Sequence, residues 1–184
     1  MILLARHGRT SENAAGRILG RRDPPLDRAG RAEAAALAVA LDAVPLRALW
    51  SSPLLRARQT ADVIATRTGL ETAVLDELIE SQRGSWEGQS VADIARESPE
   101  LFAAFHAGDP RFAFPGGESL RSQVERTRVA LARIAGGPLP ALALAHAGTI
   151  RAALAIRGRP VPPESALAHG EFFTFDVTGE PDAP

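Results

Sequence analysis

The chain has 184 residues and a formal net charge of −1; 45% of its residues are hydrophobic and 23% are charged. This length suits one domain with one core, and the composition is that of an ordinary globular protein, so we predict a single domain over residues 1–184. The near-neutral charge lacks the basic excess that non-specific binding to nucleic acids or membrane surfaces requires, and the sequence therefore predicts neither partner.

Several residue types that carry common enzyme chemistry are missing. All 21 basic residues are arginines, and the chain has no cysteine and no tyrosine. The lack of lysine excludes Schiff-base and P-loop chemistry, and the lack of cysteine and tyrosine excludes thiolate and phenolate nucleophiles. The four histidines are dispersed without the spacing of a zinc site.

The sequence shows no sign of export or membrane insertion. Residues 1–5 are apolar but are followed at once by Arg6 and His7, which is too early for the apolar core of an export signal. No apolar run approaches the roughly 20 residues that a spanning helix needs. We therefore expect a cytoplasmic protein.

Short apolar strands alternate with helical segments along the chain. Strands are predicted at residues 2–5, 46–50, 71–75, 141–145 and 171–177. Helices are predicted at residues 30–41, 54–68, 91–107 with an interruption near Pro99, 120–135 and 149–156. The repeated strand–helix units predict an α/β fold built around one layered sheet.

A histidine follows the first predicted strand. His7 lies between Arg6 and Gly8, and the glycine permits close approach of the backbone to a ligand. A neutral imidazole can attack phosphorus, while arginine forks bind phosphoryl oxygens. This motif predicts an anion site with His7 as the nucleophile, although the motif alone leaves open a solvated histidine in a surface loop.

Two further segments suit phosphate binding. Arg56 lies near the start of the helix over residues 54–68, where the helix dipole favours anions, whereas Arg58 points elsewhere around this helix and suits a surface role. His146 ends the strand over residues 141–145 and opens the next helix, so its side chain and nearby N–H groups could bind an anion. A structural, hydrogen-bonded histidine is the alternative for His146.

Taken together, these motifs resemble the histidine phosphatase superfamily, the phosphoglycerate mutase-like proteins. The resemblance covers almost the whole chain and rests on Arg6-His7-Gly8-x-Thr10, Gly20-x-x-Asp23-x-Pro25-Leu26, Arg56-Ala57-x-x-Thr60, Leu78-x-Glu80-x-x-x-Gly84-x-Trp86-Glu87-Gly88, Pro115-Gly116-Gly117-Glu118-Ser119 and His146. Two positions depart from the family pattern: Arg9 stands where many relatives have glutamate, and Ala147 replaces a common glycine. Among small members, the α-ribazole phosphatases have a similar size and motif order.

The resemblance implies a three-layer α/β/α sandwich with a mostly parallel central sheet, in which residues 77–117 form a lid or insertion. It also implies that no metal and no other cofactor takes part. Trp86 is expected to pack beneath the loop that carries it rather than to touch substrate.

The resemblance also assigns roles to individual residues. His7 is the phosphorylated nucleophile, the phosphate pocket consists of Arg6, Arg56 and His146, and Glu80 is the proton donor. A carboxyl that protonates a leaving oxygen needs a pKa tuned upward by its surroundings. An exposed loop carboxylate is the alternative for Glu80, and the rival acids nearby are Asp76, Glu77 and Glu87.

Other polar residues receive weaker assignments. Thr10 and Asn13 are candidate substrate-binding residues, for which turn-forming roles are equally open. Ser119 is a good cap for the helix that follows it. We expect His106 on a helix surface, whereas His169, beside Gly170, could border the pocket and stays unassigned.

The sequence therefore predicts a phosphomonoesterase that acts through a phosphohistidine on a small phosphorylated metabolite, such as a sugar phosphate, a phosphoglycerate-like compound or α-ribazole phosphate. A cofactor-dependent phosphoglycerate mutase is the first alternative, which the compact chain disfavours because mutases of this family are typically longer. A protein phosphohistidine phosphatase or an inactive phospholigand-binding module is the second. The expected partner is a small-molecule phosphate monoester, and a homodimer stays open because apolar helix faces could serve either a core or an interface.

Overall fold

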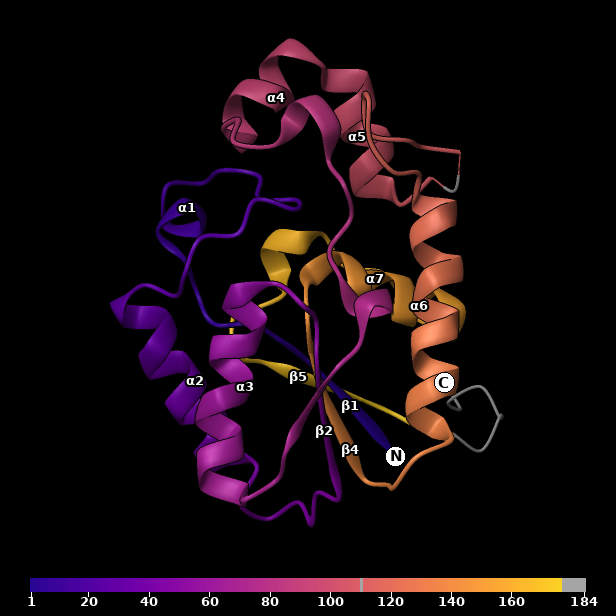
Figure 1. Cartoon of the computed structure of the whole chain (residues 1–184). Coiled ribbons are helices and arrows are strands. Elements are labelled where there is room, and N and C mark those ends of the chain that lie inside the picture. Colours follow the sequence, from indigo (N-terminus) through magenta and orange to yellow (C-terminus); the bar gives the residue numbers. More distant parts are fainter. Residues whose placement is uncertain (110, 177–184) are drawn as a thin grey trace.

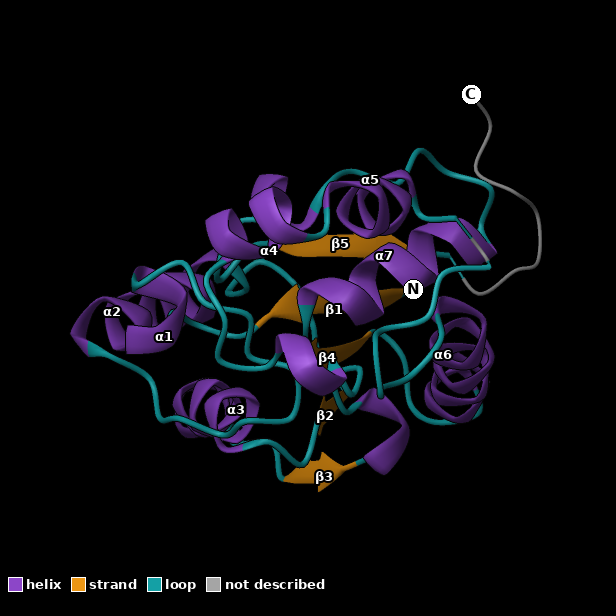
Figure 2. Cartoon of the chain, turned by 90° about the horizontal axis from the view of Figure 1, so that it is seen from above, coloured by secondary structure: helices purple, strands orange, loops and turns teal. Residues whose placement is uncertain are grey.

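The computed structural model describes residues 1–109 and 111–176. Its centre is a five-stranded sheet in the order β3-β2-β4-β1-β5, in which β5 runs antiparallel to β1 and the other pairs are parallel (Figure 2). The strands are β1 (Ile2–Arg6), β2 (Ala48–Ser51), β3 (Thr72–Val74), β4 (Ala141–Ala145) and β5 (Phe172–Phe175).

Helices cover both faces of this sheet. They are α1 (Ser11–Ala14), α2 (Arg28–Ala40), α3 (Leu55–Thr68), α4 (Val91–Glu97), α5 (Pro99–Ala107), α6 (Leu120–Ala135) and α7 (Ala147–Ile156). Helices α2 and α3 lie on one face and α6 and α7 on the other, which confirms the predicted three-layer α/β/α sandwich (Figures 1 and 2). None of the helices in the described ranges combines the length and apolar character that crossing a bilayer requires.

The side chains of the central strands point alternately to the two faces of the sheet, and a hydrophobic core lies on each face. Leu3 and Ala5 pack with α2 and α3, whereas Ile2 and Leu4 pack with α6 and α7. Successive side chains of a strand point to opposite faces, so a strand covered on both faces must be apolar throughout. This is why β1 and β4 appear in the sequence as continuous apolar runs.

Some element boundaries differ from the sequence predictions. The interruption predicted near Pro99 is confirmed: Pro99 lacks an N–H and starts a new helix after α4 ends. The last strand is shorter than the predicted residues 171–177, and Val177 lies outside the described residues. The single-domain prediction likewise includes residue 110 and residues 177–184, which are not described.

An aromatic cluster holds α4 and α5 over the carboxyl ends of the strands. Trp86 is 3% exposed and packs among Ile18, Ile94, Phe105, Phe112 and Phe114, which confirms its predicted packing role. Figure 1 shows α4 and α5 at the end of the molecule beyond the sheet. The interpretation of residues 77–117 as a lid stays a prediction.

Replacement of Ile134 tests the core between the sheet and α6. Ile134 is fully buried, and we expect Ile134→Ala to lower the free energy of unfolding by about 2–5 kcal/mol, since the truncation removes apolar contacts and leaves a cavity. Val129 lies on the same helix but is 47% exposed, so Val129→Ala should change this free energy by no more than about 0.5 kcal/mol. Urea unfolding of both variants measures the difference, and equal losses would contradict this packing.

Candidate active site

Two histidines and a serine meet where three parallel strands end. His7 follows β1, Ser52 follows β2 and His146 follows β4, and all three side chains are buried. The ring centroids of His7 and His146 are 5.1 Å apart, and Nε2 of His146 is hydrogen-bonded to Oγ of Ser52 at 2.7 Å. The common edge of the sheet thus brings together residues that are far apart in the chain.

The loop after β1 fixes the orientation of His7. The N–H of Gly8 donates to Oγ1 of Thr60 at 3.0 Å, and Nδ1 of His7 donates to the carbonyl of Gly8 at 2.8 Å. A side chain on Gly8 would come within 2.3 Å of the carbonyl oxygen of Gly30, so only glycine fits here. Because Nδ1 carries the donated proton, Nε2 of His7 keeps its lone pair.

Arg56 lies in the first turn of α3 and donates a hydrogen bond to that lone pair. Its Nε donates to Nε2 of His7 at 3.2 Å, while Nη1 and Nη2 donate to the carbonyls of Arg22 and Gly20 at 2.7 and 2.9 Å. Burial lowers the pKa of Arg56 to about 10, so the guanidinium stays charged near neutral pH. Arg58 is exposed, as predicted.

Burial and neighbouring cations keep both histidines neutral. Burial is the main cause that lowers the pKa of His7 well below its usual value, and the charge of Arg56 adds to it. The same two causes, in the same order, lower the pKa of His146. A neutral His7 is the form that can act as a nucleophile.

Arg6 completes the basic side of the pocket. Its Nη1 donates to the backbone carbonyls of Glu164 and Leu167, and its side chain lines a pocket of about 390 Å³ together with His7 and Arg56. Nε of Arg6 and Nδ1 of His146 are buried and make no hydrogen bond with any described residue. Buried polar atoms normally have partners, so Nε of Arg6 is available to an anion in the pocket, whereas His146 lies beside His7 and is not among the residues that line the pocket.

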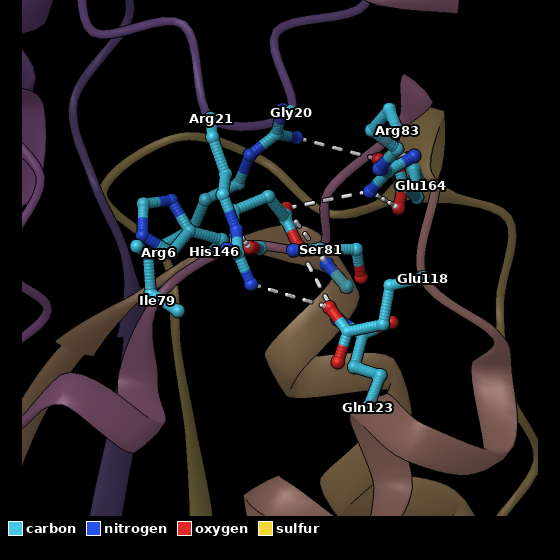
Figure 3. A network of polar contacts seen from close by, with 12 residues as sticks. Arg6, Gly20, Arg21, Ile79, Ser81, Arg83, Glu118, Gln123, His146 and Glu164 are labelled. Carbon is cyan, nitrogen blue, oxygen red and sulfur yellow. Dashed lines mark hydrogen bonds and ion pairs between the residues drawn. The ribbon is translucent and has the colours of Figure 1, made fainter. Parts of the chain in front are cut away.

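Glu80 faces the same pocket as a buried carboxylate. Its Oε1 accepts from the N–H of Ser81 at 2.8 Å and from the amide of Gln123 at 3.2 Å, and its Oε2 accepts from the N–H of Gly148 at 3.3 Å (Figure 3). At 5% exposed, Glu80 is not the exposed loop carboxylate of the alternative interpretation. The residues that line the pocket include Glu80 but not its rivals Asp76, Glu77 and Glu87.

The neighbours of Glu80 favour its ionised form. Burial raises the pKa of this carboxyl, but Arg83, the N–H of Ser81 and Arg56 together outweigh burial and hold the pKa below its usual value. These neighbours therefore do not produce the upward tuning that the role of proton donor needs. The physical reason is Arg83, whose Nη2 lies 3.4 Å from Oε2 of Glu80.

Thr10 and Asn13 form a reciprocal cap at the start of α1. The side chain of Thr10 accepts from the backbone N–H of Asn13 at 3.2 Å, and Oδ1 of Asn13 accepts from the N–H and the hydroxyl of Thr10. Both residues thus have the turn-forming role that the sequence left open. Asn13 also lines the pocket, and substrate contact by either residue stays a prediction.

The remaining two histidines, His106 and His169, also line the pocket. His106 lies on α5, as expected, and is half-buried: it lines the pocket and packs against Phe102 with ring centroids 4.3 Å apart. His169 donates from Nδ1 to the carbonyl of His7 at 2.9 Å. Burial and then Arg6 lower the pKa of His169 to about 4, so this ring is neutral near neutral pH.

Sequence reasoning missed four residues of this site. Ser52 could have been found, because it lies two positions beyond the strand predicted at residues 46–50 and directly follows the observed β2. Gln123 is helical, and its contact with Glu80 has no local signal. Arg83 and Glu164 are 81 positions apart and meet only in the folded chain.

Anion binding by the pocket is testable with inorganic phosphate. Arg56→Met removes a buried guanidinium that faces the pocket, and we expect phosphate to bind roughly ten- to a hundredfold more weakly, since hydrogen bonds to charged groups contribute about 1.5–3 kcal/mol. Arg58→Met, on the exposed side of the same helix, should leave the affinity unchanged. Titration calorimetry measures both, and thermal unfolding verifies that each variant is folded. Equal weakening in the two variants would contradict the assignment of Arg56.

Known proteins share this sequence pattern and this fold. Residues 2–168 match the model of the histidine phosphatase superfamily (branch 1). Phosphoserine phosphatase 1 of Hydrogenobacter thermophilus is 35% identical over 127 residues, which are 69% of this chain and 60% of that protein. The chain thus spans less than two thirds of that relative's length.

Solved structures agree with the family match. Mycobacterial glucosyl-3-phosphoglycerate phosphatase in complex with VO3 is 31% identical with a TM-score of 0.82, covering 93% of this chain and 90% of that one. The α-ribazole phosphatase of Shigella flexneri is 25% identical with a TM-score of 0.73, covering 93% and 87%. The match over residues 2–168 includes both strand-end histidines and Glu80, and the chain belongs to the histidine phosphatase superfamily.

Proposed function

We propose that this protein is a phosphomonoesterase that transfers a phosphoryl group from a small metabolite to His7 and then to water. The observation that carries the proposal is the contact between Nε of Arg56 and Nε2 of His7, at 3.2 Å, inside a pocket that Glu80 also lines. The pocket thus brings a neutral nucleophile, a fixed cation and a carboxyl close together. The names of the relatives support the proposal, because they are phosphatases of small phosphorylated metabolites.

In the first step, Nε2 of His7 forms a bond to phosphorus as the bond from phosphorus to the alcohol oxygen breaks. Arg6, Arg56 and His146 bind the phosphoryl oxygens, whose charge is spread over three atoms in the transition state. The proton of Glu80 goes to the departing oxygen, so the alcohol leaves neutral. The products are phosphorylated His7, ionised Glu80 and the free alcohol.

In the second step, water attacks the phosphohistidine. Glu80 is now a carboxylate and takes a proton from the water as the new oxygen–phosphorus bond forms and the bond to Nε2 of His7 breaks. Inorganic phosphate leaves, and Glu80 again holds the proton that it gave to the alcohol. The two steps together consume one water and need no metal and no second substrate.

The pocket supports a small substrate with an apolar portion. Besides its charged and polar residues, the lining of the pocket includes apolar and aromatic side chains: Ile18, Leu19, Val91, Phe102, Phe105 and His106. We propose that the alcohol part of the substrate packs against this wall. A sugar phosphate, a phosphoglycerate-like compound and α-ribazole phosphate all remain candidates, and a cytoplasmic location and a homodimer stay predictions.

The first prediction concerns His7. Wild-type protein should release phosphate from a panel of phosphomonoesters in the presence of a chelator, and His7→Ala should lower this rate by at least about a thousandfold, because the nucleophile is lost. Conversion of 3-phosphoglycerate to its isomer is followed in parallel. Isomerisation without net phosphate release would indicate the mutase, and neither activity would favour the binding module.

The second prediction concerns the apolar wall. Phe102 is partly buried in the pocket wall, so Phe102→Ala should raise KM for the best substrate roughly fivefold and leave kcat nearly unchanged, since it removes packing shared by ground and transition states. Leu101 lies on the same helix but is 43% exposed, and Leu101→Ala serves as the matched control. A change in kcat at constant KM would show that Phe102 does not contact the alcohol.

A further inference from the structure

We propose that Arg83 and Glu164 form a positioning pair that aims the carboxylate of Glu80 and sets the pH at which Glu80 exchanges its proton. The inference rests on the proposed function, because it concerns the proton donor of that reaction. Neither residue was singled out by the sequence motifs. Among the neighbours of Glu80, Arg83 is the main cause that lowers the pKa of this carboxyl against the effect of burial.

The geometry connects the three side chains directly. Nη2 of Arg83 lies 3.4 Å from Oε2 of Glu80 and 2.5 Å from Oε1 of Glu164, and Nη1 of Arg83 donates to Oε2 of Glu164 at 3.2 Å. Arg83 precedes the 3₁₀ turn Gly84–Trp86, and Glu164 begins the 3₁₀ turn Glu164–Ala166. Figure 3 shows Arg83 and Glu164 side by side in this network. One guanidinium is therefore shared between two carboxylates from distant parts of the chain.

Arg83 is held in an environment that fixes its position. It is 2% exposed, and its guanidinium carbon lies 5.2 Å from the ring centroid of Phe105 and 4.7 Å from that of Phe114. Aromatic faces attract a guanidinium and leave it few alternative positions. Buried ion pairs contribute little to stability on balance, so stability alone does not account for a charged pair here. The contact of Arg83 with Glu80, the proton donor of the proposed reaction, does account for it.

Several groups surround the carboxylate of Glu80, and Arg83 is the cation that forms an ion pair with it. The N–H groups of Ser81 and Gly148 and the amide of Gln123 donate to the carboxylate, and Nε of Arg21 donates to the main-chain carbonyl of Glu80 at 3.4 Å. The other charged groups that act on this carboxylate or on Arg83 are Arg6, Arg56, Arg151 and Glu164. His146 is neutral and adds no charge.

The two members of the pair act on Glu80 in opposite directions. Arg83 favours the carboxylate, while Glu164 offsets part of the charge of Arg83. Removal of Arg83 therefore leaves Glu80 with a weaker cationic field and raises its pKa, whereas removal of the charge of Glu164 gives Glu80 the full field and lowers its pKa. A general acid works only while it is protonated, so the rate is lost as pH rises through the pKa of Glu80 in the substrate complex.

The experiment uses the best alkyl phosphomonoester of the panel at a saturating concentration. It measures the rate of alcohol release in a single turnover as a function of pH. Arg83→Met keeps an apolar stem without the charge and should move the alkaline limb up by about one pH unit or more. Glu164→Gln should move the same limb down. Arg83→Lys should restore the limb toward the wild-type position. Arg67→Met, which removes an exposed pair with Asp42, should leave the profile unchanged.

A second substrate separates proton donation from a general structural effect. The leaving group of p-nitrophenyl phosphate is acidic and departs without a proton, so neither variant should shift its profile. An equal shift on the aryl and alkyl esters, a shift of both variants in the same direction, or no shift in either would overturn the inference. If Arg83→Met does not fold, Glu164→Gln tests the inference by itself: a downward shift of its alkaline limb on the alkyl ester alone supports the inference, and the lack of this shift overturns it.

The proposed function can fail separately. If the wild type does not hydrolyse phosphomonoesters, or if His7→Ala keeps the activity, the proposed function is wrong. If hydrolysis requires His7 but the profiles do not shift, only the inference about Arg83 and Glu164 is wrong.

Discussion

Buried positive charge is the constraint that shapes this site. Arg56 and Arg83 are 1% and 2% exposed, and Arg6 lines the pocket beside them. A charge removed from water is costly unless other groups compensate it, and Glu80 and Glu164 are the carboxylates that line this pocket. With the exposed Arg17, four guanidiniums line the pocket against two carboxylates, and a phosphate dianion would balance the excess of positive charge.

The same cationic field also prepares the nucleophile. Burial and Arg56 hold the pKa of His7 well below its usual value, so the ring is unprotonated before phosphate enters. The hydrogen bond from Nδ1 to the carbonyl of Gly8 then leaves the lone pair on Nε2. The close approach of Gly8 to Gly30 locks the loop that makes this bond. Phosphate binding and nucleophile activation thus depend on one arrangement of charges.

Local patterns predicted the scaffold and the centre of the site. Strands β1 and β4 are buried on both faces and therefore continuous in apolar sequence, and parallel strands end at one edge, so His7 and His146 were expected at the same edge. The pair of Arg83 and Glu164 left no such pattern, because it forms across 81 positions of sequence. The direction of the pKa shift of Glu80 could not be predicted for the same reason, since the neighbouring cation reverses the effect of burial.

One carboxyl must act as an acid in the first step and as a base in the second. Under the proposed mechanism, the negative charge of the incoming phosphate raises the pKa of Glu80 and favours the protonated form that the first step needs. Once the alcohol has left with that proton, Arg83 stabilises the carboxylate that the second step needs. The substrate thus supplies the charge that favours protonation, and the protein supplies the charge that favours ionisation. This division lets Glu80 serve both steps from a single position.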